Sequence, residues 1–87
     1  MQLTRDLILI ARARQAAQSG EAAAIRRAAG LSLAEVATAI GVTPSAVCKW
    51  ESGDRLPRSD VARRYAQLLE ALDRETGRRR EPEAVPA

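Results

Sequence analysis

The residues best suited to chemistry in this 87-residue chain form a run of small and polar side chains that begins at Pro44. Ser45 carries a hydroxyl, Ala46 a methyl group and Lys49 an ammonium group. In the major groove of a DNA duplex, serine can bond a base edge, alanine can contact the thymine methyl, and lysine can reach guanine O6 and N7. A helix that begins with small residues can also approach another surface closely. The pattern leaves open a second interpretation, an alanine-rich surface helix without a partner.

Basic residues follow this run. Arg55 and Arg58 lie where a phosphate backbone would be in reach, and we expect them to bind phosphates rather than to be simple turn residues. Arginine supplies all but one of the 14 cations, and its planar guanidinium makes bidentate contacts that lysine cannot copy. GC-rich codon usage would give the same bias. Arg63 and Arg64 are expected to form a solvated face of the last helix.

The composition argues against several classes of function. The chain has no histidine and one cysteine, Cys48, so it can form neither a cysteine–histidine zinc site nor an intrachain disulfide. A glycine-rich phosphate loop and a nucleophile–base pair are also missing, so we expect no enzyme, catalytic residue, metal or cofactor. An aromatic content of 2% provides no stacking platform for RNA. The net charge of +3 permits a polyanionic partner without requiring one.

The longest strongly apolar run, Leu7 to Ala11, is too short for a signal-peptide core or a membrane span. We therefore expect a cytoplasmic protein with no membrane partner. Since the length allows one domain with one modest core, there is no room for a separate effector domain, and no small-molecule ligand is expected.

The periodicity of apolar residues predicts an all-α fold, a compact bundle of about five helices in one domain over residues 1–76. The predicted helices span residues 3–18, 21–29, 33–40, 44–52 and 60–76. The charged segment 77–87, with its arginine run 78–80, is predicted to be a disordered tail. In the first helix, Ile8 and Leu9 widen the apolar arc beyond one stripe, so this domain's core or a second subunit must cover it.

The two central helices are predicted to form a helix-turn-helix. Ser32 and Glu35 form a capping box, in which each side chain bonds the backbone amide of the other residue. Gly41 permits the sharp turn that follows, Thr43 caps the next helix, and Pro44 suits its first position. The apolar Val42 is expected to pack between the two helices. Trp50 is expected in the core or in a dimer contact rather than stacked on a base.

The stretch from Gly30 to Pro57 contains GLSLAEVA, then IGVTPSAV, then WESGDRLP. It resembles the Cro/C1-type, or XRE-like, helix-turn-helix family of lambdoid phage repressors, including phage Cro and immunity repressors, and of many bacterial regulators. The resemblance covers residues 22 to 72 approximately. It implies base contacts from the second motif helix and phosphate contacts around it.

The resemblance assigns roles by position. The residues expected to contact bases are Pro44, Ser45, Ala46, Cys48 and Lys49. Those expected to contact phosphates are Ser32, Leu33, Thr43, Ser52, Arg55 and Arg58. Glu51 matches an acid that pairs in relatives with an arginine of the first core helix, for which Arg26 is the candidate. Leu33 stands where relatives usually carry a glutamine that helps recognition, so specificity is expected to depend on Lys49, Ser45 and DNA shape.

The leading hypothesis is a sequence-specific regulator that binds double-stranded DNA, most simply a repressor that occludes its operator. Because one helix in one groove reads few base pairs, we expect a homodimer on a pseudo-palindromic operator, paired through the last helix or the arc around Ile8 and Leu9. The alternative hypothesis is an antitoxin or anti-regulator that uses the same fold to bind a protein.

Overall fold

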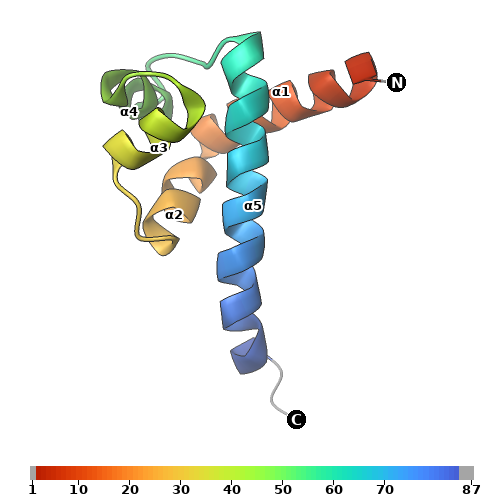
Figure 1. The fold of residues 1–87 in the computed structure, drawn as a ribbon, viewed down its shortest axis with the longest axis vertical. Helices are drawn as coiled ribbons and strands as arrows, with labels where there is room; N and C mark the ends of the chain where they lie inside the picture. Colours follow the sequence, from red (N-terminus) through yellow and green to blue (C-terminus); the bar gives the residue numbers. More distant parts are fainter. Residues whose placement is uncertain (1, 85–87) are drawn as a thin grey trace.

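The computed structural model describes the backbone of residues 2–84 and the side chains of residues 3–77. Five helices and no strand form within this range, which confirms the predicted all-α class. The helices are α1 (Gln2–Ser19), α2 (Glu21–Ala28), α3 (Leu33–Ile40), α4 (Pro44–Ser52) and α5 (Ser59–Ala84). Figure 1 shows α2, α3 and α4 grouped on one side of the long α5, with α1 crossing α5 near its beginning.

Both central helices have the bounds that their local sequence signals predict. Ser32 and Glu35 form the capping box at the beginning of α3, and the Thr43 hydroxyl accepts a hydrogen bond from the Ala46 amide at the beginning of α4. Gly41 and Gly53 end these helices with φ angles of 82° and 85°. Residues other than glycine rarely adopt such φ angles, so Gly41 and Gly53 end α3 and α4 at these positions.

The last helix is longer than predicted. It was expected to end at Thr76, before Gly77, but α5 continues to Ala84; residues 85–87 lie outside the described residues. Gly77 is not among the glycines with positive φ, so it does not form a helix stop. One glycine costs a helix about 1 kcal/mol relative to alanine, and the arginines and glutamates beside it are good helix formers. The predicted end at Thr76 is therefore corrected to Ala84.

Small aliphatic side chains and one aromatic pair fill the core. Each helix contributes a buried residue, namely Leu9, Ile25, Val36, Val47 and Tyr65. The rings of Trp50 and Tyr65 lie 4.9 Å apart at 46°, within the range of favourable aromatic pairs. Trp50 is thus a core residue that fixes α4 against α5.

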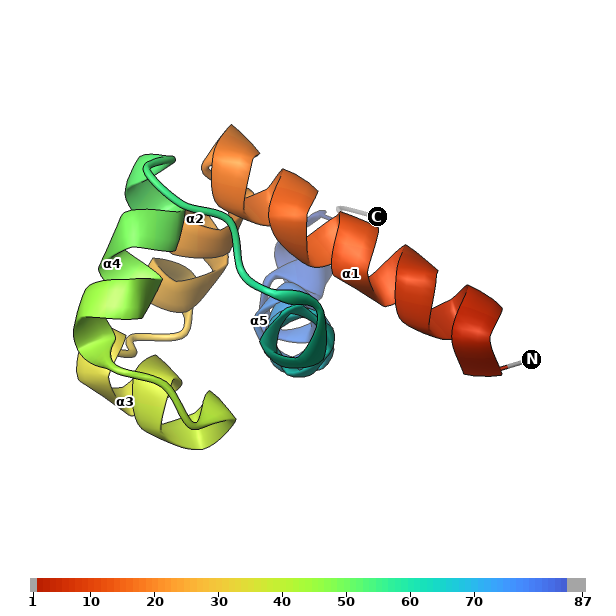
Figure 2. The ribbon, with the colours of Figure 1, turned by 90° about the horizontal axis from the view of Figure 1, so that it is seen from above.

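The wide apolar arc of α1 is divided between core and solvent. Leu9, Ala13 and Ala17 are buried, whereas Leu3, Leu7 and Ile8 are exposed. Seen from above in Figure 2, the first turns of α1 project beyond α5, away from α3 and α4. The domain's own core therefore covers only one side of the arc.

The Tyr65 hydroxyl is buried and has no hydrogen-bond partner among the described residues. Because an unpaired buried hydroxyl is costly, Tyr65→Phe is expected to raise the free energy of unfolding by about 1 kcal/mol. Burial also raises the pKa of Tyr65 above its ordinary value of 10.0. Ionisation of Tyr65 therefore does not affect stability well below pH 10, but the free energy of unfolding falls as the pH rises further, because the unfolded chain releases the phenol proton more readily than the folded one.

Denaturant unfolding at pH 7 and pH 11 checks both effects, with the wild type as reference. The wild type should lose stability between the two values, and Tyr65→Phe should lose less. Equal losses in the two proteins would contradict this role for the chain's one tyrosine.

Candidate nucleic-acid interface

The helix α4 lies across the bundle so that one face is buried and the other is free. Val47 and Trp50 point into the core, at 0% and 4% exposure. On the opposite face, the exposed residues are Pro44, Ser45, Cys48 and Lys49. Helical spacing produces this separation, since residues three and four apart share a face. The four predicted base-reading positions thus form one continuous surface.

Ala46 differs from the other predicted base-reading residues. It is half-buried and packs against the core, beside the half-buried Val42 of the turn. The Val42 amide donates to the Ala37 carbonyl at 2.9 Å, which closes the end of α3. Val42 thus packs inward against the core, and Ala46 lies at the edge of the exposed face.

The beginning of α3 provides a second group of predicted contacts. The Ser32 hydroxyl accepts from the Glu35 amide at 3.0 Å, and the Glu35 carboxylate accepts from the Ser32 amide at 2.8 Å. Ser32 is exposed, whereas Leu33 is half-buried and packs its side chain against the core. Leu33 therefore offers its backbone, not its side chain, to a partner at this helix end.

The end of α4 and the loop that follows it hold the third group. Ser52, the last residue of α4, is exposed, and so are Arg55 and Arg58 in the loop and Thr43 at the other end of α4. The Lys49 carbonyl fixes the loop by accepting from the Ser52 hydroxyl at 3.1 Å and the Asp54 amide at 3.0 Å. A shallow groove of about 280 Å³ separates α4 from the loop. Its lining residues are Val42, Ala46, Trp50, Arg55, Leu56, Arg58, Asp60 and Val61.

An ion pair connects α2 to α4 below this surface. Arg26 Nε and Nη2 donate to the two carboxylate oxygens of Glu51 at 2.7 and 2.9 Å. Arg26 Nη1 also donates to the Leu31 carbonyl at 2.9 Å, just before α3. The side chains are only 13% and 10% exposed, and the hydrogen bond to Glu51 raises the pKa of Arg26. The structure thus brings together the two residues that the family resemblance pairs.

Two arginines support the interface in a way that the sequence analysis missed. Arg14 of α1 donates from Nε to the carbonyl of the buried Pro57 at 3.1 Å, and Arg64 of α5 donates from Nε to the Ile40 carbonyl at 3.2 Å. The first bond holds the loop that carries Arg55, and the second holds the end of α3. Arg64 is exposed, as expected for a residue on a solvated face, and the bond to Ile40 is the part that was not expected. No signal in the sequence marks either contact, because both join segments distant along the chain.

Removing the loop contact should have a measurable cost. Arg14→Met keeps an apolar stem but no donor, so the free energy of unfolding should fall by about 1–2 kcal/mol. Amide hydrogens in the loop from Gly53 to Arg58 should also exchange faster. Arg12→Met is the matched control on the same helix, because Arg12 is exposed and its pair with Glu70 lies at the surface. Similar effects from both substitutions would contradict a specific role for Arg14.

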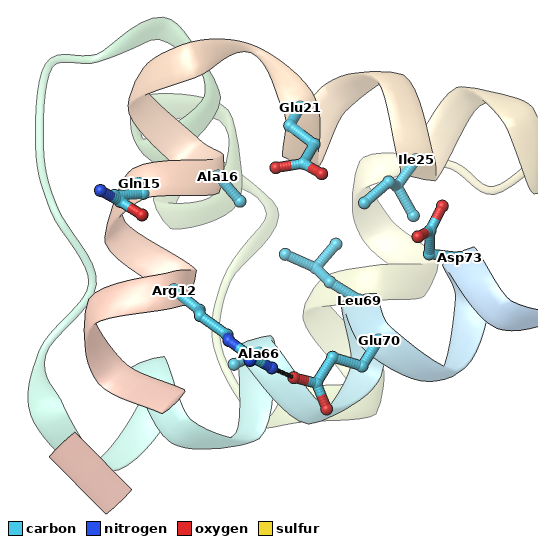
Figure 3. A pocket seen from close by; sticks show the side chains of 9 residues that line it. All are labelled: Arg12, Gln15, Ala16, Glu21, Ile25, Ala66, Leu69, Glu70 and Asp73. Carbon is cyan, nitrogen blue, oxygen red and sulfur yellow. Dashed lines mark hydrogen bonds and ion pairs between the residues drawn. The ribbon is translucent and has the colours of Figure 1, made fainter. Parts of the chain in front are cut away.

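Acidic residues collect elsewhere on the molecule. Figure 3 shows a cavity of about 290 Å³ between α1, α2 and α5, where Arg12 reaches Glu70. Glu21 and Asp73 add two more carboxylates to its lining, and no residue of α3 or α4 lines it. Carboxylates repel phosphates, so this cavity cannot serve a nucleic-acid backbone. The exposed Lys49, Arg55 and Arg58 lie instead on α4 and in the loop after it, beside the acidic Asp54 and Asp60.

In the part of the chain that the structure describes, the acidic and cysteine side chains include no group of three placed to hold a metal ion. None of its helices combines the length and apolar character needed to cross a bilayer.

Residues 23–80 match the family described as "Helix-turn-helix". The matched range includes α3, α4 and most of α5, but it excludes α1. Curated proteins and solved structures give no significant match. Because the family match covers well over half of the chain and the geometry agrees with it, the chain belongs to the Cro/C1-type, XRE-like helix-turn-helix family of DNA-binding transcription regulators.

Proposed function

We propose that the protein is a sequence-specific transcriptional repressor that inserts α4 into the major groove of its operator and blocks access by other proteins. The single observation that carries this proposal is the exposed face of Pro44, Ser45, Cys48 and Lys49 at the beginning of α4. Early residues of a recognition helix meet base edges in this class of protein. The proposed place of action is the cytoplasm of a bacterial cell or of a phage-infected host.

Base reading depends on few side chains in this proposal. Lys49 donates to guanine O6 and N7, and Ser45 donates to or accepts from a neighbouring base. The Ala46 methyl, at the edge of the face, contacts a thymine methyl. Pro44 and Cys48 allow close approach but are poor hydrogen-bonding partners for bases. Sequence-dependent DNA shape therefore contributes to specificity.

Phosphate contacts position α4 in the groove. Thr43 and the backbone amide of Leu33 lie at helix beginnings, where exposed N–H groups attract anions. The Ser32 amide donates to Glu35, but the exposed Ser32 hydroxyl accepts from the Glu35 amide and keeps its O–H to donate to a phosphate. Ser52, Arg55 and Arg58 bind the backbone on the other side of the helix. These contacts carry most of the affinity and make it dependent on salt.

The operator is proposed to be pseudo-palindromic and to bind two copies of the chain. One recognition helix contacts too few base pairs for useful selectivity, and a second copy on a half-site one helical turn away doubles the sequence that is read. Occlusion then needs nothing more than occupancy of the site.

Selection of duplexes from a random-sequence library with the full chain tests the proposal, followed by footprinting upstream of its own gene. We expect a selected sequence with two related half-sites and a footprint over the promoter. A salt titration should show affinity falling steeply, as several phosphate contacts require. Failure to enrich any sequence would contradict specific DNA recognition.

The second candidate function, an antitoxin or anti-regulator that holds a protein partner, is favoured by the exposed Leu3, Leu7 and Ile8 of α1. A double substitution, Lys49→Ala with Arg55→Ala, discriminates the two. It should abolish regulation if DNA is the target and leave it intact if a protein is the target.

A further inference from the structure

The first turns of α1 carry an apolar face that none of the described residues covers. Leu3, Leu7 and Ile8 are 70%, 59% and 49% exposed. Ala11 and Thr4 are exposed beside them, so five uncharged residues form one strip. Residues four apart share a helix face, which places Leu3, Leu7 and Ala11 in one row, with Thr4 and Ile8 in the next.

This strip is distinct from the DNA-binding surface. Among the described side chains, the other large exposed apolar residue is Leu56, which lies in the loop beside the groove of α4. The strip belongs to α1, outside the residues that match the family, and Figure 2 shows that end of α1 directed away from α3 and α4. A partner seated on the strip would leave both motif helices free to bind DNA.

We propose that the strip is the contact between two copies of this chain, with the two α1 helices packed antiparallel about a twofold axis at Leu7. This inference rests on the proposed binding of two copies to one operator, and it names the surface that joins them. Twofold contacts are self-complementary, because the same patch must fit itself.

The pattern of residue sizes fits such a pairing. With Leu7 at the twofold axis, a residue that lies a given number of positions before Leu7 in one copy is level with the residue that lies the same number of positions after Leu7 in the other copy. Leu3 of one copy therefore meets the small Ala11 of the other, and Leu7 meets Leu7. Ile8 lies next to the second Ile8 on the same flank. Large side chains thus face small ones at both ends of the contact, which lets the helices approach closely.

The distribution of charge also fits a second copy. No charged residue stands in the strip, whereas Arg5 and Asp6 occupy the sides of α1 that turn away from it. The Asp6 carboxylate already lies 3.7 Å from Arg63 of α5. Antiparallel pairing brings Arg12 level with position 2 of the other copy, so the arginines do not oppose each other.

The contact is small, and this sets its strength. Stable complexes bury about 800 Å² on each partner, more than a strip three turns long provides. We therefore expect weak association in solution, with a Kd on the order of 0.1–1 mM. On DNA, neighbouring half-sites hold the two copies close together, and a weak contact then suffices for cooperative binding.

Sedimentation equilibrium of the full chain without DNA tests the contact, up to about 1 mM protein. Leu7→Lys and Leu7→Glu should each weaken self-association at least tenfold, because like charges then meet at the axis. An equimolar mixture of the two variants should restore association, because residue 7 meets its own counterpart. Gln18→Lys is the matched control: it adds the same charge to an exposed position of α1 beyond the strip.

The outcomes separate this inference from the proposed function. A wild-type protein that stays monomeric at the highest concentration would overturn the contact, and so would Leu7 variants that associate as the wild type does. The contact is supported if association is restored in the equimolar mixture of Leu7→Lys and Leu7→Glu and in neither variant by itself. None of these readings involves DNA, so a failure of operator selection with intact mixing behaviour would count against the proposed function only.

Discussion

Glu51→Ala is expected to lower the free energy of unfolding by about 3–5 kcal/mol, the largest effect of any single substitution considered for this chain. The carboxylate accepts two hydrogen bonds from Arg26 at a site where both side chains are nearly buried. Its removal leaves the guanidinium with the Leu31 carbonyl and without a counter-charge. Because the pair joins α2 to α4, α4 should also become mobile. Denaturant unfolding followed by circular dichroism measures the loss.

A double substitution distinguishes an orphaned charge from a general loss of packing. Arg26→Met with Glu51→Leu removes both charges and keeps similar volumes, so it should recover most of the stability lost in Glu51→Ala. If the double variant were as unstable as the single one, the cost would have to come from packing. If Glu51→Ala lowered the free energy of unfolding by less than about 1 kcal/mol, the pair would contribute no more than an ordinary surface ion pair does.

Lys49→Ala is expected to weaken binding to the selected operator by about 1–3 kcal/mol and to relax the base preference at the position it reads. The Lys49 side chain is exposed on α4, at the C-terminal end of the proposed base-reading surface. Removal of a base contact should weaken binding to the operator more than binding to random DNA, so the ratio of the two affinities should fall. Parallel titrations with operator and with shuffled duplex measure that difference.

Arg55→Ala provides the contrasting result. A phosphate contact carries no sequence information, so its loss should weaken binding to operator and shuffled DNA about equally and reduce the salt slope by about 1. Arg74→Ala is the control, because Arg74 is exposed on the far part of α5. If Lys49→Ala behaved like Arg55→Ala, Lys49 would be a backbone contact and the proposed base-reading surface would be wrong.

Much of the fold follows from local signals in the sequence. The capping box at Ser32, the Thr43-Pro44 beginning and the glycines at 41 and 53 act within one helical turn, and they place α3 and α4 correctly. The alternation of buried and exposed residues along α4 also follows from its own periodicity. The exposed face with Ser45 and Lys49 could therefore be predicted from the sequence.

Other features depend on contacts between segments far apart in the chain, and only the tertiary structure decided them. Arg14 and Arg64 look like ordinary surface arginines until Pro57 and the end of α3 come within reach of them. In the sequence, Ile8 and Leu9 belong to one apolar arc. In the folded chain, the packing of α1 buries Leu9 and leaves Ile8 exposed to solvent. The type of a residue determines which hydrogen bonds it can form and how readily it is buried, whereas the packing of whole helices determines which partner it contacts. The sequence thus determined α3, α4 and the face that α4 presents. Tertiary packing determined which arginines support that face and which apolar residues of α1 stay exposed.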